Sequence, residues 1–157
     1  VALALDAEFR IAGPGGRRTV SAEEFFSGPF ETAVGPDEIL VSVGYPTYTG
    51  WNTHYEKFNR TAQAWSIVGV AVAVRMDGGT IAEARIGLTN VGGEPVRARA
   101  VEEALVGAST MAEIAAAAEK ASDGLNPFGD EDADPEFRKH LARVLTKRAV
   151  ATAAGIA

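Results

Sequence analysis

Cysteine is absent from the 157 residues of the sequence, and histidine is nearly so. Without thiols the chain forms no disulfide, supplies no cysteine ligand to an iron–sulfur cluster and has no thiolate nucleophile. The two histidines, His54 and His140, are too few for a multi-histidine metal site. The sequence therefore predicts neither thiol chemistry nor a metal site in this chain.

An excess of positive charge and a long apolar run are also missing. The net charge is −6, which argues against a nucleic-acid partner because such partners require a basic surface. The longest apolar run, residues 67–74, has the length of a strand and is far below the roughly 18 residues that cross a bilayer. Hydrophobic residues make up 46% of the chain, so one ordinary domain or two small ones can form a core.

The first six residues lack both an initiator methionine and the basic start of a signal peptide. They look like the middle of a strand. Two explanations stay open at this point: a trimmed or processed terminus, or a domain whose first half is missing.

The opening third of the sequence has the pattern of a β-rich unit. Strands are predicted over residues 3–12, 18–20 and 38–45, separated by Gly- and Pro-containing turns. Ser21 and Glu24 have the spacing of a capping box, so a short helix is predicted through Phe26 and ends at Gly28.

A β-hairpin is predicted next. From Trp65 to Val74 valines alternate with small residues, so both faces are apolar and the strand should be buried on both sides, with the small face open to close approach by a helix. A turn at residues 77–79 leads into a return strand over 80–91. Strict alternation there places Ala84 with the core residues and Ile81 on the opposite face.

The remainder is predicted to be helical. Helices are expected over residues 98–106, 110–121 and from Asp134 onward, with a surface loop at 122–133. On the last helix the predicted apolar stripe consists of Phe137, Leu141, Val144, Leu145 and Ala149, and Arg138 is placed off it. Strands followed by helices indicate an α+β fold in which helices cover one face of an antiparallel sheet, with a boundary in the loop near residues 46–54.

One segment gathers side chains suited to binding a flat, anionic cofactor. Residues 55–60 hold Lys57, Phe58 and Arg60, and Trp65 follows shortly afterwards. A lysine at a sheet edge can hydrogen-bond an anionic ring or phosphate, and a tryptophan at the mouth of a strand can stack on a ring. The alternative is that Phe58 and Trp65 belong to the core and that the two cations are ordinary surface residues.

These segments resemble the flavoprotein subunit of the carbon monoxide dehydrogenase and xanthine dehydrogenase family of molybdenum hydroxylases. The resemblance rests mainly on residues 55–60, 65–74 and 86–92, with support from 21–28, 36–40, 136–138 and 145–149. The matching segments run in the family's order over nearly the whole chain.

The resemblance implies that residues 1–53 form the end of the second FAD-binding subdomain, of the vanillyl-alcohol-oxidase type. It implies that residues 54–157 form a small antiparallel sheet flanked by helices. The two Gly-rich loops that hold the FAD pyrophosphate in this family have no counterpart in the sequence, so the isolated chain should bind FAD weakly or not at all. Tight stoichiometric flavin on this chain alone would contradict that expectation.

Three residues match family positions near the flavin. Leu40 matches a residue that packs near the flavin ring, and Trp65 matches an aromatic residue beside the ring face. Lys57 matches a lysine at the isoalloxazine end of the site, where a cation stabilises the reduced, anionic flavin. Ala64 stands where the family usually has an aspartate, which puts a polar contact there in doubt. The resemblance implies no catalytic residue and no metal ligand in this chain.

By the same resemblance, the whole enzyme is a cytoplasmic hetero-oligomer. A large subunit with molybdopterin oxidises the substrate, a small subunit with two [2Fe–2S] clusters relays electrons, and FAD passes them to an external acceptor. Carbon monoxide, an aldehyde or an N-heterocycle remain possible substrates. Two other hypotheses stay open: a non-catalytic module for docking partner subunits, and an independent small binding domain.

Overall fold

The computed structural model describes residues 1–156, which form an α+β fold built from three antiparallel sheets. The strands are β1 (Glu8–Gly13), β2 (Gly16–Ser21), β3 (Phe26–Gly28), β4 (Glu31–Thr32), β5 (Ile39–Gly44), β6 (Trp51–Phe58), β7 (Val68–Asp77), β8 (Thr80–Thr89) and β9 (Val96–Arg97). The helices are α1 (Ala22–Phe25), α2 (Arg99–Leu105), α3 (Met111–Ala118), the 3-10 helix η1 (Glu119–Ser122) and α4 (Pro135–Ala154). Within the described residues no helix has the length and apolarity to cross a membrane.

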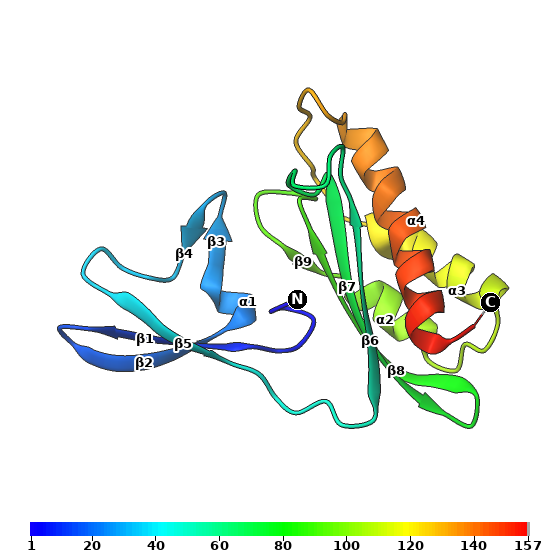
Figure 1. Ribbon diagram of the computed structural model, residues 1–157, viewed down its shortest axis with the longest axis horizontal. Helices are drawn as coiled ribbons and strands as arrows, with labels where there is room; N and C mark the ends of the chain where they lie inside the picture. Colours follow the sequence, from blue (N-terminus) through cyan, green and yellow to red (C-terminus); the bar gives the residue numbers. More distant parts are fainter. Residues whose placement is uncertain (157) are drawn as a thin grey trace.

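The larger unit is a four-stranded sheet, β6-β7-β8-β9, with α2, α3 and α4 on one face (Figure 1). The alternating valines of β7 point toward these helices and are fully or almost fully buried with them in one core. The capping box at Thr110 and the N-cap at Asp134 begin α3 and α4 as predicted. The α+β prediction, with helices over one face of the sheet, is confirmed.

The small-residue face of this sheet is covered by the start of the chain and not by a helix. Ala71 and Ala73 are buried there, and a Cβ added at Gly87 would lie 3.4 Å from Ala4. The expectation of a helix on this face was wrong. Residues 1–6 form a hydrogen-bonded turn instead of a strand, because Asp6 has a left-handed backbone, φ 44°, that interrupts extended structure.

The predicted hairpin is present, with left-handed glycines at its turn, but one face assignment was wrong. Ile81 is fully buried with the valines of β7, whereas strict alternation placed it on the opposite face. A bulge causes the difference: Arg75 pairs with Glu83 and Met76 with Ile81, so Ala82 is the extra residue.

Helix α4 buries a stripe that is shifted from the predicted one at its first turn. Phe137 is exposed, whereas Arg138 is only 2% exposed. Leu141, Leu145 and Ala149 are buried as predicted. The guanidinium of Arg138 reaches backbone and carboxylate acceptors, which an alternation of apolar and polar residues does not reveal.

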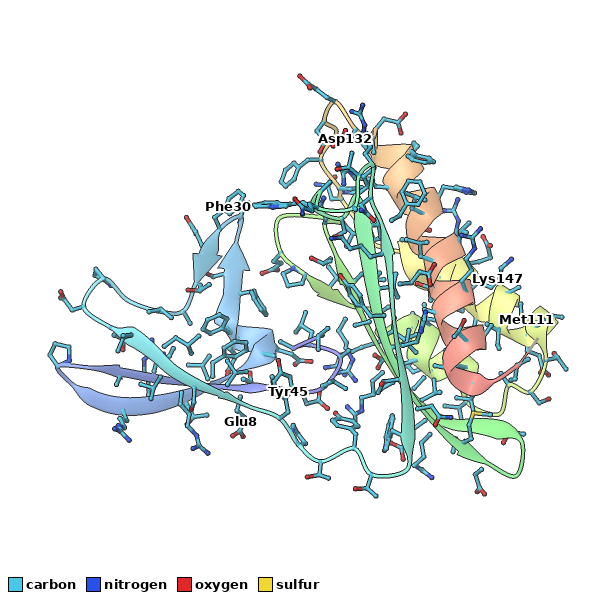
Figure 2. All side chains as sticks on the ribbon, viewed as in Figure 1. Glu8, Phe30, Tyr45, Met111, Asp132 and Lys147 are labelled. Carbon is cyan, nitrogen blue, oxygen red and sulfur yellow. The ribbon has the colours of Figure 1, made fainter. Side chains whose placement is uncertain are left out.

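The smaller unit consists of the sheet β2-β1-β5, the helix α1 and the hairpin β3–β4. Its core contains Phe9 and Phe25, whose rings stack with centroids 3.7 Å apart. The short helix ends at Phe25 and not at Gly28, because the next residues pair as β3 and β4. Phe30 lies at the tip of this hairpin, facing the larger unit (Figure 2).

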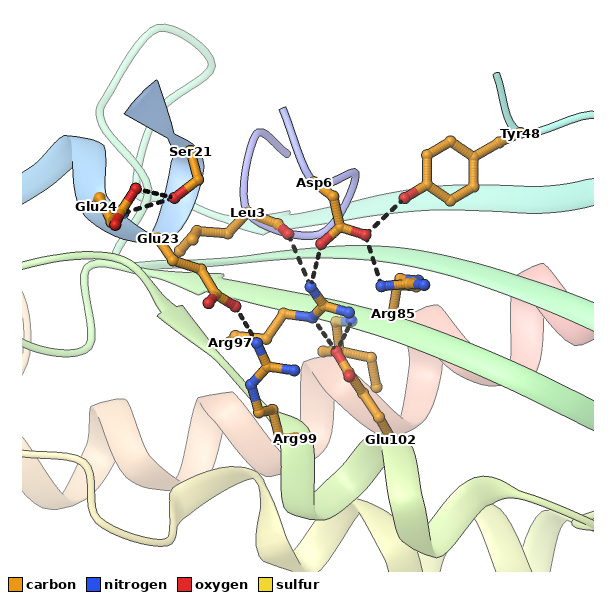
Figure 3. A network of polar contacts seen from close by, with 11 residues as sticks. Leu3, Asp6, Ser21, Glu23, Glu24, Tyr48, Arg85, Arg97, Arg99 and Glu102 are labelled. Carbon is orange, nitrogen blue, oxygen red and sulfur yellow. Dashed lines mark hydrogen bonds and ion pairs between the residues drawn. The ribbon is translucent and has the colours of Figure 1, made fainter. Parts of the chain in front are cut away.

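A polar network joins the two units (Figure 3). Asp6 accepts hydrogen bonds from Arg97 at 2.7 Å, Arg85 at 2.6 Å and Tyr48 at 3.1 Å. Arg97 also pairs with Glu102 of α2, and its side chain is only 6% exposed. Burial lowers the pKa of Arg97, but the hydrogen bonds to Glu102 and Asp6 outweigh it and the net shift is upward.

One ion pair of the smaller unit makes the folding stability of the chain depend on pH. Arg18 donates to both carboxylate oxygens of Glu38, which lowers the pKa of Glu38 from 4.5 to about 2. A carboxylate with a depressed pKa stabilises the fold above its unfolded pKa, and this contribution is lost as the pH falls from 4.5 to about 2.

We therefore expect Glu38→Gln to destabilise the chain at neutral pH and to matter progressively less between pH 4.5 and about 2. Urea unfolding midpoints of both proteins across that range measure the effect. If the difference in urea midpoint between wild type and variant stays constant down to pH 2, the lowered pKa of Glu38 is contradicted.

The predicted division after residue 53 stays a prediction. Residues 45–50 join the two units, and strand β6 contains residues on both sides of the proposed boundary.

Candidate flavin-binding site

The site predicted from sequence centres on the end of β6 and the residues that lead into β7. Lys57 pairs in register with Gly69, so its side chain shares the sheet face that is turned toward the smaller unit. It is exposed and forms no ion pair with any residue from 1 to 156. Beside it, a Cβ added at Gly69 would lie only 2.6 Å from the Tyr55 hydroxyl, so a larger residue there would displace the Tyr55 side chain.

Trp65 lies outside the strand that was predicted to begin with it, because β7 starts at Val68. Its side chain is 78% exposed and its ring centroid lies 6.1 Å from that of Phe30, which is 92% exposed. The two rings come from different units, and their planes are tilted by 50°. With Phe128 they line a pocket of about 400 Å³. The interpretation of Trp65 as a core residue is therefore wrong.

Leu40 lies apart from the other two candidates. It is on β5, paired with Ile11 in the three-stranded sheet, and is 39% exposed. Its neighbours Ile39 and Val41 are exposed as well, so the strand presents apolar side chains to solvent. The structure thus places Leu40 on one unit and Lys57 on the other, while Trp65 lies where the two units meet.

The residues between β6 and β7 are held by three polar contacts. Arg60 forms an ion pair with Asp132 at 2.8 Å, and Asn90 donates to the carbonyl of Ser66 at 2.8 Å. The third contact runs from the guanidinium of Arg138 to the carbonyl of Ile67. Arg60 is thus a surface cation, as one of the two interpretations had it.

Sequence reasoning missed Phe30, Phe128 and Arg138. Phe30 is a non-glycine residue with φ 61°, exposed at a hairpin tip, and its position after Gly28-Pro29 was the available signal. Its approach to Trp65 depends on how the two units pack, which no local pattern encodes.

The exposed side chains fit a flat ring that carries negative charge. Lys57 offers a cation without an ion pair among residues 1–156, Trp65 and Phe30 offer exposed rings, and Leu40 is a partly exposed apolar residue of β5. The described residues contain no cluster of His, Asp or Glu able to hold a metal ion. The chemistry of this surface is therefore that of ring stacking and charge stabilisation.

Two family models match the chain. Residues 53–153 match the CO dehydrogenase flavoprotein C-terminal domain, and residues 1–48 match the FAD binding domain in molybdopterin dehydrogenase. The chain belongs to the family of FAD-binding medium subunits of molybdenum hydroxylases, as the resemblance in sequence indicated.

Individual relatives come from several branches of this family. It is 35% identical to the carbon monoxide dehydrogenase medium chain of Hydrogenophaga pseudoflava, over 96% of this chain and 53% of that protein. It is 28% identical to the putative xanthine dehydrogenase FAD-binding subunit of Escherichia coli K12, over 99% of this chain and 54% of that one. The chain thus spans about half the length of these relatives.

Solved structures of molybdenum hydroxylases have the same fold over nearly the whole chain. Carbon monoxide dehydrogenase from Hydrogenophaga pseudoflava superposes with a TM-score of 0.91 at 37% identity, covering 98% of this chain and 54% of that chain. Quinoline 2-oxidoreductase from Pseudomonas putida 86 gives 0.92 at 31% identity, with the same coverage of both chains. The predicted fold, a flavin-subdomain end followed by the flavoprotein C-terminal domain, is confirmed.

Proposed function

We propose that this chain supplies part of the FAD environment in a cytoplasmic molybdenum hydroxylase. In that enzyme, electrons pass from the [2Fe–2S] clusters of a small subunit through FAD to an external acceptor, after substrate oxidation in a molybdopterin-containing large subunit. The observation that carries the proposal is that Lys57 is exposed on the sheet face turned toward the smaller unit and that Trp65 is exposed beside Phe30 of that unit. The family to which the chain belongs supports the proposed activity of the whole protein.

Each residue has a separate role in this proposal. FAD, when bound, would take up electrons one at a time from the one-electron clusters and hold two of them for the acceptor. The ammonium group of Lys57 stabilises negative charge at the isoalloxazine end, Trp65 stacks beside the ring face, and Leu40 packs near the ring. Because Ala64 replaces the family's usual aspartate, no carboxylate of residue 64 contributes there.

Lys57→Ala in the natural full-length polypeptide, assembled with its partner subunits, is expected to lower the flavin reduction potential. Loss of a cation beside reduced flavin costs at least about 1.4 kcal/mol, which is about 30 mV for a two-electron couple. Redox titration of the flavin absorbance measures the shift.

The matched control is Lys120→Ala, which removes an exposed lysine from η1 on the helical side of the sheet and should leave the potential unchanged. If Lys57→Ala leaves flavin content, potential and turnover at wild-type values, the chain serves as a docking module for its partner subunits and the proposal fails.

A further inference from the structure

Residues 59–67, here called the β6–β7 segment, carry Trp65 and directly follow Lys57 and Phe58. Their base is closed by a backbone hydrogen bond of 2.7 Å from Ile67 N–H to the carbonyl of Phe58. The position of this segment therefore sets where Trp65 lies relative to Lys57. Whatever holds the segment also controls the geometry of the candidate flavin site.

Arg138 of α4 holds the base of the segment from the helical side of the sheet. One guanidinium nitrogen, Nη1, donates to the carbonyl of Ile67, and Nη2 donates to the carboxylate of Asp130. The side chain is 2% exposed, and its Nε has no hydrogen-bond partner among the described residues. Burying a guanidinium is costly, so this arginine is poorly explained as a contribution to stability alone.

Asp130 connects Arg138 to the far end of the segment. Its Oδ1 accepts hydrogen bonds from the backbone N–H groups of Asp132 at 3.0 Å and Ala133 at 2.9 Å. The hydrogen bond from Ala133 has the largest effect on Asp130 and lowers its pKa. The hydrogen bond from Asp132 and the contact with Arg138 lower this pKa further. Asp132, fixed in this turn, forms the 2.8 Å ion pair with Arg60.

Two contacts thus hold the β6–β7 segment, one near each of its ends. Arg138 binds Ile67 at one end, and Asp132 binds Arg60 at the other, with Asp130 joining the two contacts. We propose that Arg138 is a positioning residue, which through Asp130 and Ile67 fixes Trp65 for contact with the flavin ring. The inference rests on the proposed function, because it assigns Arg138 a role through that same site.

The test uses the natural full-length polypeptide in its assembled complex, with the substitutions Arg138→Met and Asp130→Asn. Methionine keeps an apolar stem but removes both donors. In Asp130→Asn, Oδ1 can still accept from the turn, but an N–H group replaces the oxygen that faces Arg138. The matched control is Arg143→Met, which removes an arginine of the same helix that binds Ser122 and Glu119 instead.

We expect both test variants to raise the flavin dissociation constant at least threefold and to alter the visible circular dichroism of the flavin. Amide hydrogen exchange of residues 59–67 should rise at least tenfold, with little change in the strands β7 and β8. Arg143→Met should change none of these three properties. A role in overall stability alone would raise exchange throughout the sheet and leave the flavin spectrum unaltered.

Wild-type flavin affinity and dichroism in a folded Arg138→Met protein would overturn the inference, as would equal effects of Arg143→Met. If Arg138→Met does not fold, Asp130→Asn decides by the same two criteria. A wild-type complex without flavin would refute the proposed function instead. In that case exchange in residues 59–67 still decides whether Arg138 holds the segment.

Discussion

Arg97→Met is expected to loosen the attachment of residues 1–6 to the larger unit and to cost about 3 kcal/mol of folding free energy. Arg97 is almost completely buried between Asp6 and Glu102, and it also donates to the carbonyl of Leu3 at 3.2 Å. Methionine keeps the apolar stem but leaves Glu102, itself mostly buried, without its charged partner. Denaturant unfolding monitored by circular dichroism measures the cost.

Arg99→Met is the matched control. Arg99 also forms an ion pair across the two units, with Glu23 of α1, but both side chains are more than half exposed. An exposed pair contributes about 0–1 kcal/mol, so the control should be nearly neutral. Equal losses for the two variants would show that burial of Arg97 does not strengthen this contact. Faster hydrogen exchange in residues 1–6 of Arg97→Met would locate the effect.

Leu145→Ala is the second substitution with a large expected effect. Leu145 is 1% exposed on the face of α4 that covers the four-stranded sheet, inside the larger core. Truncation of a buried leucine removes apolar contacts and leaves a cavity, which costs about 2–5 kcal/mol. The unfolding midpoint in urea should fall accordingly.

Val106→Ala provides the comparison, because Val106 is an exposed apolar residue after α2. Its loss should change the free energy of unfolding by no more than about 0.5 kcal/mol. If Leu145→Ala lowers the free energy of unfolding no more than Val106→Ala, helix α4 does not pack against the sheet as the structure indicates.

Local signals in the sequence predicted those elements whose causes are local. The turn at residues 77–79 has two glycines with positive φ, and the caps at Thr110 and Asp134 form the hydrogen bonds that their spacing indicated. These interactions join residues only a few positions apart, so the sequence contains both partners within one short window.

The errors in the fold arose where distant residues decide the structure. Ile81 is buried because a bulge changes the register of β8. The buried Arg138 has acceptors on two separate loops, at Asp130 and at Ile67 just before β7. The start of the chain packs on β8 against Gly87, a contact that spans most of the sequence. An alternating pattern records which residues are apolar but not which of them a remote segment covers.

The candidate site was accessible from sequence only in part. Lys57 and Trp65 were proposed from their residue types and from the family resemblance, and both are exposed in the structure. Phe30 and Arg138 contribute through packing between units and between layers, which the sequence does not state. The roles of Leu40, Lys57 and Trp65 toward FAD remain predictions.

Fluorescence of Trp65 in the flavin-loaded full-length polypeptide tests the central claim most directly, in a variant in which Trp51 and any tryptophan outside these 157 residues are replaced by phenylalanine. If Trp65 stacks beside the isoalloxazine ring, its emission is strongly quenched and recovers when the flavin is removed. Emission that is the same with and without flavin would contradict the placement of Trp65 at the ring.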